Sequence, residues 1–179
     1  MTRRFFVPAL FAAIWISAVA GQTPNPIEIL GPLSSSETAH LRVNAGVSVP
    51  AITLGTPFSV VFDVTPLRNM HVYAPGKHMY QVVSVEVASR PWLQVKPTTY
   101  PPSTIYHFKP LDERVEVYSK PFRLARALDI AATAANRKAL AGRTTVTLDA
   151  TLAYQACDDR LCYSPQKVSM SWTVPLQDK

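Results

Sequence analysis

The sequence has few of the residues from which hydrolytic and nucleic-acid-binding sites are built. Its 179 residues include only 12 Asp and Glu and four His, and they contain neither a Gly-x-Ser-x-Gly nor a His-Glu-x-x-His motif. The 18 Lys and Arg residues are scattered and are not interleaved with aromatic residues in one patch. These absences argue against hydrolytic catalysis and against nucleic-acid binding.

Long apolar runs are also scarce, with one exception at the N-terminus. A pair of arginines precedes an uncharged apolar run at 5–16, and Ala18-Val19-Ala20 then supplies the small-x-small pattern of a cleavage site. This layout predicts a secretory signal peptide over residues 1–20 and a mature chain that starts at Gly21. The run is short for a membrane span, which needs about 20 apolar residues. We therefore expect a periplasmic or otherwise exported protein.

Glycine is sparse, with six residues, whereas 16 prolines punctuate the chain. Between them, short segments alternate apolar and polar residues, as half-buried strands do. The two clearest segments, 145–154 and 167–174, lie near the C-terminus. The other predicted apolar faces are Phe58, Val60, Phe62 and Val64; Val83, Val85 and Val87; Val115 and Val117; and Leu124, Leu128 and Ile130. Many short strands with proline-rich turns predict an all-β sandwich.

The sandwich is expected to occupy residues 41–179 as one domain, since a mature chain of about 159 residues is long enough for one hydrophobic core. Residues 21–40 form an extended N-terminal segment, which is either a flexible lead or an edge strand. The alanines within 131–141 favour a helix, and a loop with one helical turn is the alternative.

Cysteine is the scarcest informative residue, because Cys157 and Cys162 are the only two. They flank a four-residue connection between the two C-terminal strands. Opposite residues of an antiparallel pair have Cα atoms about 4.5–5.5 Å apart, and a disulfide needs about 4.4–6.8 Å. The pair can therefore close and reopen with little movement of the backbone. In an exported protein it is either a structural staple or a redox couple, and the spacing alone does not separate the two.

Residue parity predicts an irregularity beside this pair. If Cys157 faces Cys162, an odd position pairs with an even one, whereas the apolar positions of both strands are even-numbered. One extra residue must then be absorbed within 163–166, where Pro165 lacks a backbone N–H. We predict a β-bulge or break there. The adjacent Asp158 and Asp159 are expected to be solvated or to form the turn.

The cysteine run also resembles a known motif. Tyr154-Gln155-Ala156-Cys157, then Cys162 after four residues and Pro165 shortly after, resembles the signature of the N-terminal periplasmic domain of the DsbD thiol:disulfide interchange family. Met70-His71-Val72-Tyr73 is similar to the family's His-x-Tyr segment. Two further runs resemble its middle strands: Glu116-Val117-Tyr118 and Phe122-Arg123-Leu124.

Membership would imply an immunoglobulin-like sandwich that passes electrons from a membrane-embedded partner to periplasmic proteins. Cys162 would form the mixed disulfide with a client, and Cys157 would resolve it. In the family the chain continues into a membrane domain and a thioredoxin-like domain. Neither follows Cys162 in this sequence, so we expect the donor to act in trans. The clients would be periplasmic thioredoxin-like or disulfide-bearing proteins, and the exchange needs no metal or organic cofactor.

The same resemblance implies a loop that shields the cysteines, here residues 108–114. Phe108 and Leu111 are the candidates for the shielding side chain, and Asp112 and Glu113 are candidates for tuning the thiols. The residues expected to support the pair are Tyr73, Tyr154, Tyr163 and Pro165.

Two other functions compete with thiol–disulfide exchange. The first is a non-catalytic exported β-sandwich binding module in which the disulfide is structural. The second is copper handling, because Met70-His71 and His78-Met79 flank the turn at 74–77 and thioether, imidazole and thiolate ligands suit Cu(I). Two such dipeptides are a weak pattern, and strand side chains such as that of His71 commonly pack instead.

Overall fold

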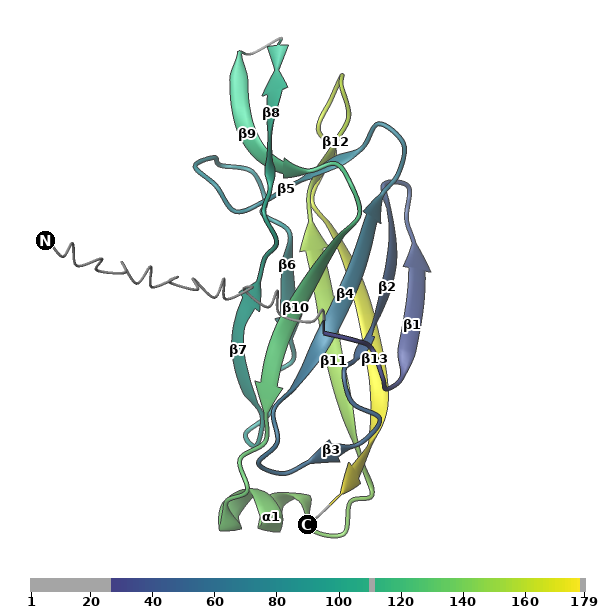
Figure 1. Cartoon of the computed structure of the whole chain (residues 1–179), viewed down its shortest axis with the longest axis vertical. Helices are drawn as coiled ribbons and strands as arrows, with labels where there is room; N and C mark the ends of the chain where they lie inside the picture. The colour runs from purple at the N-terminus through teal and green to yellow at the C-terminus, as the bar shows by residue number, and fades with distance from the viewer. Residues whose placement is uncertain (1–26, 110–111, 178–179) are drawn as a thin grey trace, which may run out of the picture.

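The computed structural model describes residues 27–109 and 112–177, which form an elongated β-sandwich (Figure 1). The predicted signal peptide, the predicted mature start at Gly21 and the candidate shielding residue Leu111 lie outside these residues. Within the described part of the chain, no helix is long and apolar enough to cross a membrane.

The first layer of the sandwich is a five-stranded antiparallel sheet. Its strands, in spatial order, are β1 (Leu33–Glu37), β2 (Leu41–Val47), β4 (Phe58–Pro66), β10 (Phe122–Asp129) and β7 (Gln94–Thr99). A bulge between Arg126 and Leu128 shifts the register of β10 against β7. β1 is an edge strand, so the edge-strand alternative holds for residues 33–37 of the N-terminal segment.

The second layer is a four-stranded sheet. Its strands, in order, are β3 (Ile52–Thr53), β13 (Gln166–Gln177), β11 (Thr145–Tyr154) and β6 (Ser84–Val87). All pairs are antiparallel except β13 with β3. The long hairpin of β11 and β13 is the one that residue alternation predicted, and its even-numbered residues pair with one another, as Val146 does with Val174.

A third, smaller sheet extends the sandwich at one end. It contains β12 (Ala156–Cys157), β5 (His71–Tyr73), β9 (Glu113–Tyr118) and β8 (Thr104–Phe108). Figure 1 shows this sheet and the cysteine hairpin together at the end opposite the helix α1 (Ala134–Leu140).

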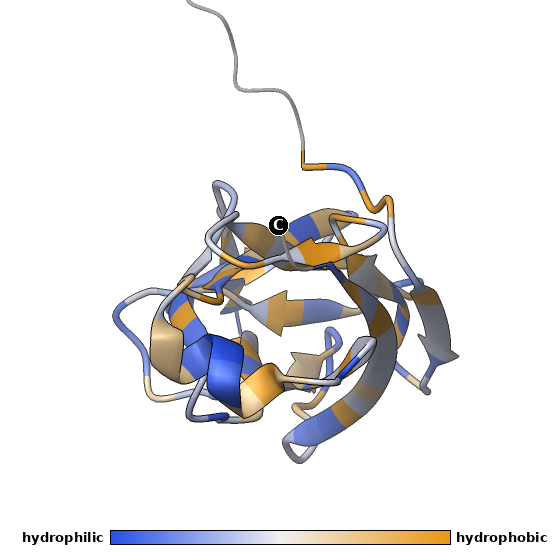
Figure 2. Cartoon of the chain, turned by 90° about the horizontal axis from the view of Figure 1, so that it is seen from below, coloured by the Kyte–Doolittle hydropathy of each residue, from blue (hydrophilic) through white to orange (hydrophobic). Residues whose placement is uncertain are grey.

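The core lies between the two large sheets. The predicted faces of β4, β11 and β13 point inward, and Phe62 and Trp172 meet edge to face with ring centroids 6.0 Å apart. Val83 and Ile130 lie just outside β6 and β10 but are also fully buried. In the end-on view of Figure 2, strands surround this interior and their hydropathy alternates from residue to residue, as the sequence pattern requires.

The only α-helix among the described residues is the one that the alanine-rich segment favoured. Thr133 caps its N-terminus by accepting a hydrogen bond from the backbone N–H of Asn136 at 3.2 Å. Gly142, with φ of 74°, follows its C-terminus, where a left-handed residue ends a helix at no steric cost. The helix therefore forms from local signals, although it has only seven residues.

Candidate active site around the cysteine pair

The cysteine pair stands where the hairpin of β11 and β13 changes sheets. Tyr154 pairs with Gln166 at the end of the long ladder, whereas Cys157 pairs with Cys162 in an isolated bridge. Two residues separate these pairs on the first strand and three separate them on the second, at 163–165. The predicted break is confirmed, and Pro165 lies in it. Beyond the break, β12 turns to pair with β5, where Cys157 is opposite His71.

The two cysteines are bonded to each other, but the residues differ in exposure. Cys157 and Cys162 form a disulfide with their Cα atoms 4.1 Å apart. Cys157 is only 1% exposed, whereas Cys162 is an exposed residue. A solvent-borne thiol can therefore approach Cys162 far more easily than Cys157.

Asp158 organises the connection between the cysteines. Its carboxylate accepts hydrogen bonds from the backbone N–H groups of Arg160 (2.7 Å) and Leu161 (2.9 Å) and from the hydroxyl of Tyr163 (2.9 Å). These bonds, with that from Leu161 first, lower the pKa of Asp158 below its usual value. Asp158 is therefore the turn-forming residue that its position predicted, and Tyr163 supports the turn from the break that precedes β13.

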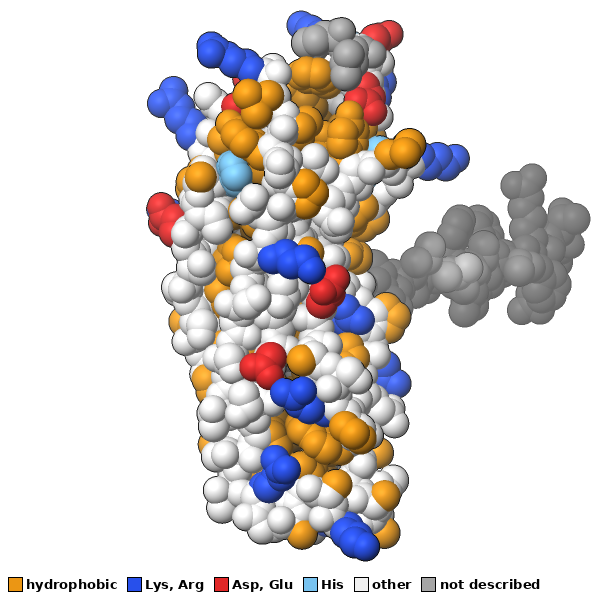
Figure 3. Space-filling view, turned by 180° about the vertical axis from the view of Figure 1, so that it is seen from behind, with side chains coloured by type: hydrophobic (Ala, Val, Ile, Leu, Met, Phe, Trp, Pro, Cys, Tyr) orange, Lys and Arg blue, Asp and Glu red, His pale blue; other side chains and the backbone are white. Residues whose placement is uncertain are grey.

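A cavity of about 290 Å³ lies over the disulfide. Aromatic and apolar side chains dominate its lining: His71, Tyr73, Tyr80, Tyr106, Phe108, Glu113, Val115, Cys157, Asp158, Arg160, Leu161 and Cys162. On the face shown in Figure 3, hydrophobic side chains gather at this end of the molecule with charged side chains around them, and a second hydrophobic group lies toward the opposite end. Leu161, Ile105 and Met79 are exposed apolar residues of this end.

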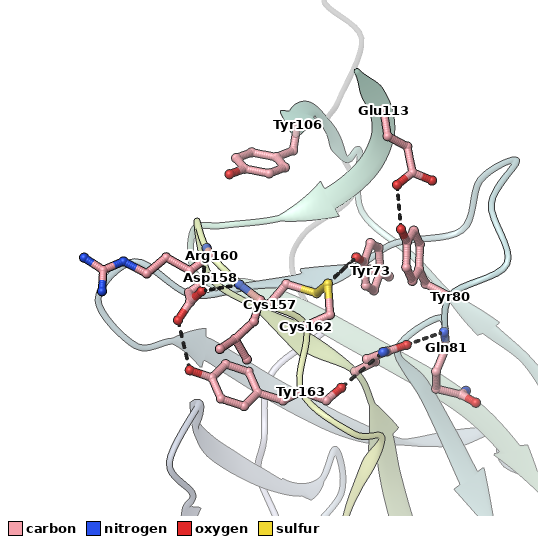
Figure 4. Close-up of a disulfide and its surroundings, with 12 residues drawn as sticks. Tyr73, Tyr80, Gln81, Tyr106, Glu113, Cys157, Asp158, Arg160, Cys162 and Tyr163 are labelled. Atoms are coloured by element: carbon pink, nitrogen blue, oxygen red, sulfur yellow. Dashed lines mark hydrogen bonds between the residues drawn. A yellow bond between two sulfur atoms is a disulfide. The ribbon is translucent and has the colours of Figure 1, made fainter. Parts of the chain in front are cut away.

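Tyr73 makes the closest polar contacts with the disulfide (Figure 4). Its hydroxyl oxygen lies 3.0 Å from Sγ of Cys157 and 3.2 Å from Sγ of Cys162. Its ring stacks on that of Tyr80, with centroids 4.1 Å apart and planes 3° from parallel. The Tyr80 hydroxyl donates to Oε2 of Glu113 at 2.5 Å. Burial raises the pKa of Tyr73, so its hydroxyl keeps its proton at neutral pH.

His71 and Tyr106 connect the third sheet to the cysteine connection. Their rings lie 4.3 Å apart, and the Tyr106 hydroxyl donates to Oδ1 of Asp159 at 3.0 Å. Burial lowers the pKa of His71, against the opposing influence of Asp159 and Asp158. The hairpin of β8 and β9 is therefore fastened at two points, through Tyr106 to the cysteine connection and through Glu113 to Tyr80.

The predicted shielding loop is the turn of this hairpin. Phe108 ends β8 and Glu113 begins β9, and both line the cavity. Asp112 instead binds His107 at 2.7 Å with its side chain 89% exposed, so the structure places it away from the sulfur atoms. Tyr154 does not line the cavity, and its hydroxyl lies 2.9 Å from that of Thr38.

The side chains of the two Met-His dipeptides have different surroundings. Met79 is fully exposed, whereas His71 is buried against Tyr106. Among the residues that the structure describes, no group of three or more His, Cys, Asp or Glu residues is placed to hold a metal ion.

Sequence reasoning missed several residues of the cavity, above all Tyr80 and Tyr106. Tyr80 lies outside the described strands, and Tyr106 lies in a half-exposed strand without a clear alternating pattern. Tyr106 reaches the cavity only through the pairing of strands that are distant in sequence, whereas Tyr80 reaches it from a loop by stacking on Tyr73. Their aromatic type was the one available signal, and it was shared with five other tyrosines.

Comparison with known proteins places this site in a family. The family model described as "Thiol:disulfide interchange protein DsbD, N-terminal" matches residues 50–172. No curated protein matches the chain.

The N-terminal periplasmic domain of ScsB from Proteus mirabilis has a similar fold, with a TM-score of 0.50, 12% identity, and 75% of this chain covering 46% of that one. Two further structures have lower TM-scores. One is the reduced N-terminal domain of Neisseria meningitidis DsbD, with a TM-score of 0.40 and 16% identity over 67% of this chain and 82% of that one. The other is the GAE domain of GGA2p from Saccharomyces cerevisiae, with a TM-score of 0.41 and 9% identity over 81% of this chain and 98% of that one. This chain thus spans less than half of the ScsB domain.

The family match covers well over half of the sequence. The chain therefore belongs to the family of DsbD N-terminal domains, as an immunoglobulin-like β-sandwich with a disulfide-forming cysteine pair.

Proposed function

We propose that the protein is an exported thiol–disulfide exchange domain in which Cys162 reacts with partner proteins and Cys157 resolves the mixed disulfide. The observation that carries this proposal is the unequal exposure of the two disulfide-bonded cysteine residues. Exchange requires in-line access to one sulfur and a second thiol close behind it. Exposed Cys162 meets the need for access, and buried Cys157 is the second thiol behind it.

The reaction balances with cysteine chemistry alone. In the reduced protein, the Cys162 thiolate attacks a client disulfide, and one client sulfur leaves as a thiolate. The Cys157 thiolate then attacks Sγ of Cys162, the mixed disulfide breaks, and the second client sulfur leaves. Two electrons have passed to the client, and the Cys157–Cys162 disulfide has formed. A donor dithiol that attacks Cys162 in the same way reverses these steps.

The partners follow from this chemistry. The donor is a dithiol carrier, which we assign to a membrane-embedded protein acting in trans in the periplasm, as family membership supports. The clients are disulfide-bearing proteins, thioredoxin-like ones among them. The apolar lining of the cavity supports contact with an uncharged surface around the client's reactive cysteine.

The two single serine variants test these roles. With oxidised glutathione as the probe, Cys157→Ser should accumulate a stable adduct at Cys162. Cys162→Ser should react at least about tenfold more slowly, because its remaining thiol is buried. Mass spectrometry of the intact protein measures the glutathione adduct of each variant over time. Equal adduct formation by the two variants would contradict the assignment.

The reduction potential separates exchange from the binding-module alternative. Equilibration against glutathione should give a potential in the range of exchange proteins. A potential below about −300 mV would indicate a structural bond and would reject the proposal.

A further inference from the structure

The buried sulfur of Cys157 presents a chemical problem that the proposed function leaves open. When a donor thiolate attacks Cys162, the disulfide breaks and Cys157 must leave as a thiolate in a site that is almost closed to water. Burial of a thiolate is unfavourable and raises the pKa of the thiol. Glu113 and Asp158 add negative charge to the cavity lining, and Arg160 is its one permanently positive side chain.

Tyr73 offers the leaving sulfur a hydrogen bond at this point. Its hydroxyl oxygen lies 3.0 Å from Sγ of Cys157. Neither sulfur of a disulfide carries a hydrogen, so the tyrosine O–H is the donor in this contact. Because Tyr73 is buried and stays protonated, the donor is present in every redox state of the pair.

We propose that Tyr73 is a catalytic residue of the exchange reaction, whose hydroxyl hydrogen-bonds to the Cys157 thiolate as the disulfide opens. The inference rests on the proposed function and deepens it. The donor thiolate forms a bond to Sγ of Cys162, and the electron pair of the broken bond passes to Sγ of Cys157. The Tyr73 proton stays on oxygen and is shared with that sulfur, and solvent later supplies the proton of the Cys157 thiol.

Tyr80 and Glu113 are positioning residues for this hydroxyl. The parallel stack of Tyr80 on Tyr73 fixes the plane of the Tyr73 ring, and the hydrogen bond from Tyr80 to Glu113 fixes Tyr80 in turn. Glu113 begins β9 in the hairpin that borders the cavity. The hairpin and the leaving sulfur are therefore linked through two tyrosine rings.

The direct test is the thiol pKa of Cys157 in a Cys162→Ala background, followed by thiolate absorbance. Adding Tyr73→Phe should raise that pKa by about one unit, the effect of losing a hydrogen bond to a charged group. The same substitution in a Cys157→Ala background should shift the Cys162 pKa by less, because exposed Cys162 is hydrated. A larger shift at Cys162 would overturn the assignment to Cys157.

Reduction of the intact disulfide by dithiothreitol gives a second readout, for which Tyr73→Phe should be about tenfold slower. Tyr80→Phe should slow it in the same direction by less, and it serves as the test if Tyr73→Phe does not fold. Tyr118→Phe is the matched control, because its buried hydroxyl donates to the Pro101 carbonyl at 2.8 Å, outside the cavity. The proposal would be overturned if Tyr73→Phe and Tyr118→Phe gave the same Cys157 thiol pKa and the same rate of disulfide reduction. If Tyr73→Phe cannot be made, a folded Tyr80→Phe protein that is reduced at the wild-type rate would overturn it.

These measurements need neither a client nor a biological donor. Failure of glutathione trapping with a normal Tyr73 effect would reject the proposed function alone. Normal trapping without a Tyr73 effect would reject this inference alone.

Discussion

At the scale of single residues, Asp158 shows how one side chain shapes the reactive connection. Its carboxylate accepts hydrogen bonds from two backbone N–H groups and one hydroxyl, and these bonds favour the ionised form. The sequence alone indicated a turn-forming or solvated aspartate. It did not indicate which of the two adjacent aspartates would turn inward, because that depends on the position of Tyr163 within the strand break.

Asp158 gives the connection a pH dependence with a defined sign. Its pKa in the folded protein lies below the ordinary value of 3.8, so its stabilising effect is present above that value and is lost as the pH falls through the lower, folded pKa. We expect the amide resonances of Arg160 and Leu161 to titrate together with a midpoint below 3.8. In Asp158→Asn this titration should disappear. A midpoint at or above the ordinary value would contradict the hydrogen-bonded turn.

At the scale of elements, residue alternation identified strands in all three sheets, including β9 of the small one, but missed the alternating strand β2 and two edge strands. Alternation identified β4, β11 and β13, and residue parity alone was enough to expect the break that lies at 163–165. β7 and β8 escaped prediction because they lie at sheet edges and have mixed exposure, so they lack a clear period of two. Asp112 and Glu113 are neighbours in sequence, yet only Glu113 reaches the cavity.

The hairpin of β8 and β9 makes the element-scale prediction. Tyr106 fastens it to the cysteine connection through Asp159, while its ring packs against that of His71. Tyr106→Phe keeps this ring contact and removes the hydrogen bond, which contributes about 1 kcal/mol net, or roughly fivefold in the opening equilibrium. We therefore expect iodoacetamide to alkylate Cys157 several-fold faster in the reduced variant.

His107→Gln provides the control within the same hairpin. His107 binds Asp112 on the exposed side and does not line the cavity. In the reduced His107→Gln protein, iodoacetamide should alkylate Cys157 at the wild-type rate. If both variants or neither accelerate alkylation, the contact between Tyr106 and Asp159 does not govern access to Cys157.

At the scale of the whole molecule, the disulfide stands apart from the structure that keeps the domain folded. The main core lies between two large sheets, whereas the smaller buried cluster around Cys157 contains Tyr73, Val115 and Val117. A connection of four residues restricts the unfolded chain little, so the chain-entropy model gives the bond about 2 kcal/mol of stabilisation. An exchange protein needs this separation because it must stay folded in both redox states.

The relative sizes of two destabilisations test this separation. Phe62 is fully buried against Trp172, so Phe62→Ala should lower the free energy of unfolding by about 3–5 kcal/mol. Reduction of the disulfide in the wild-type protein should lower it by only about 2 kcal/mol, which urea unfolding with and without a reductant measures. By thermodynamic linkage, the fold then favours the disulfide by the same free energy, about 40 mV in reduction potential. Such a small bias leaves the pair reducible by an ordinary dithiol donor. A reduced protein less stable than Phe62→Ala would instead make the bond a structural staple.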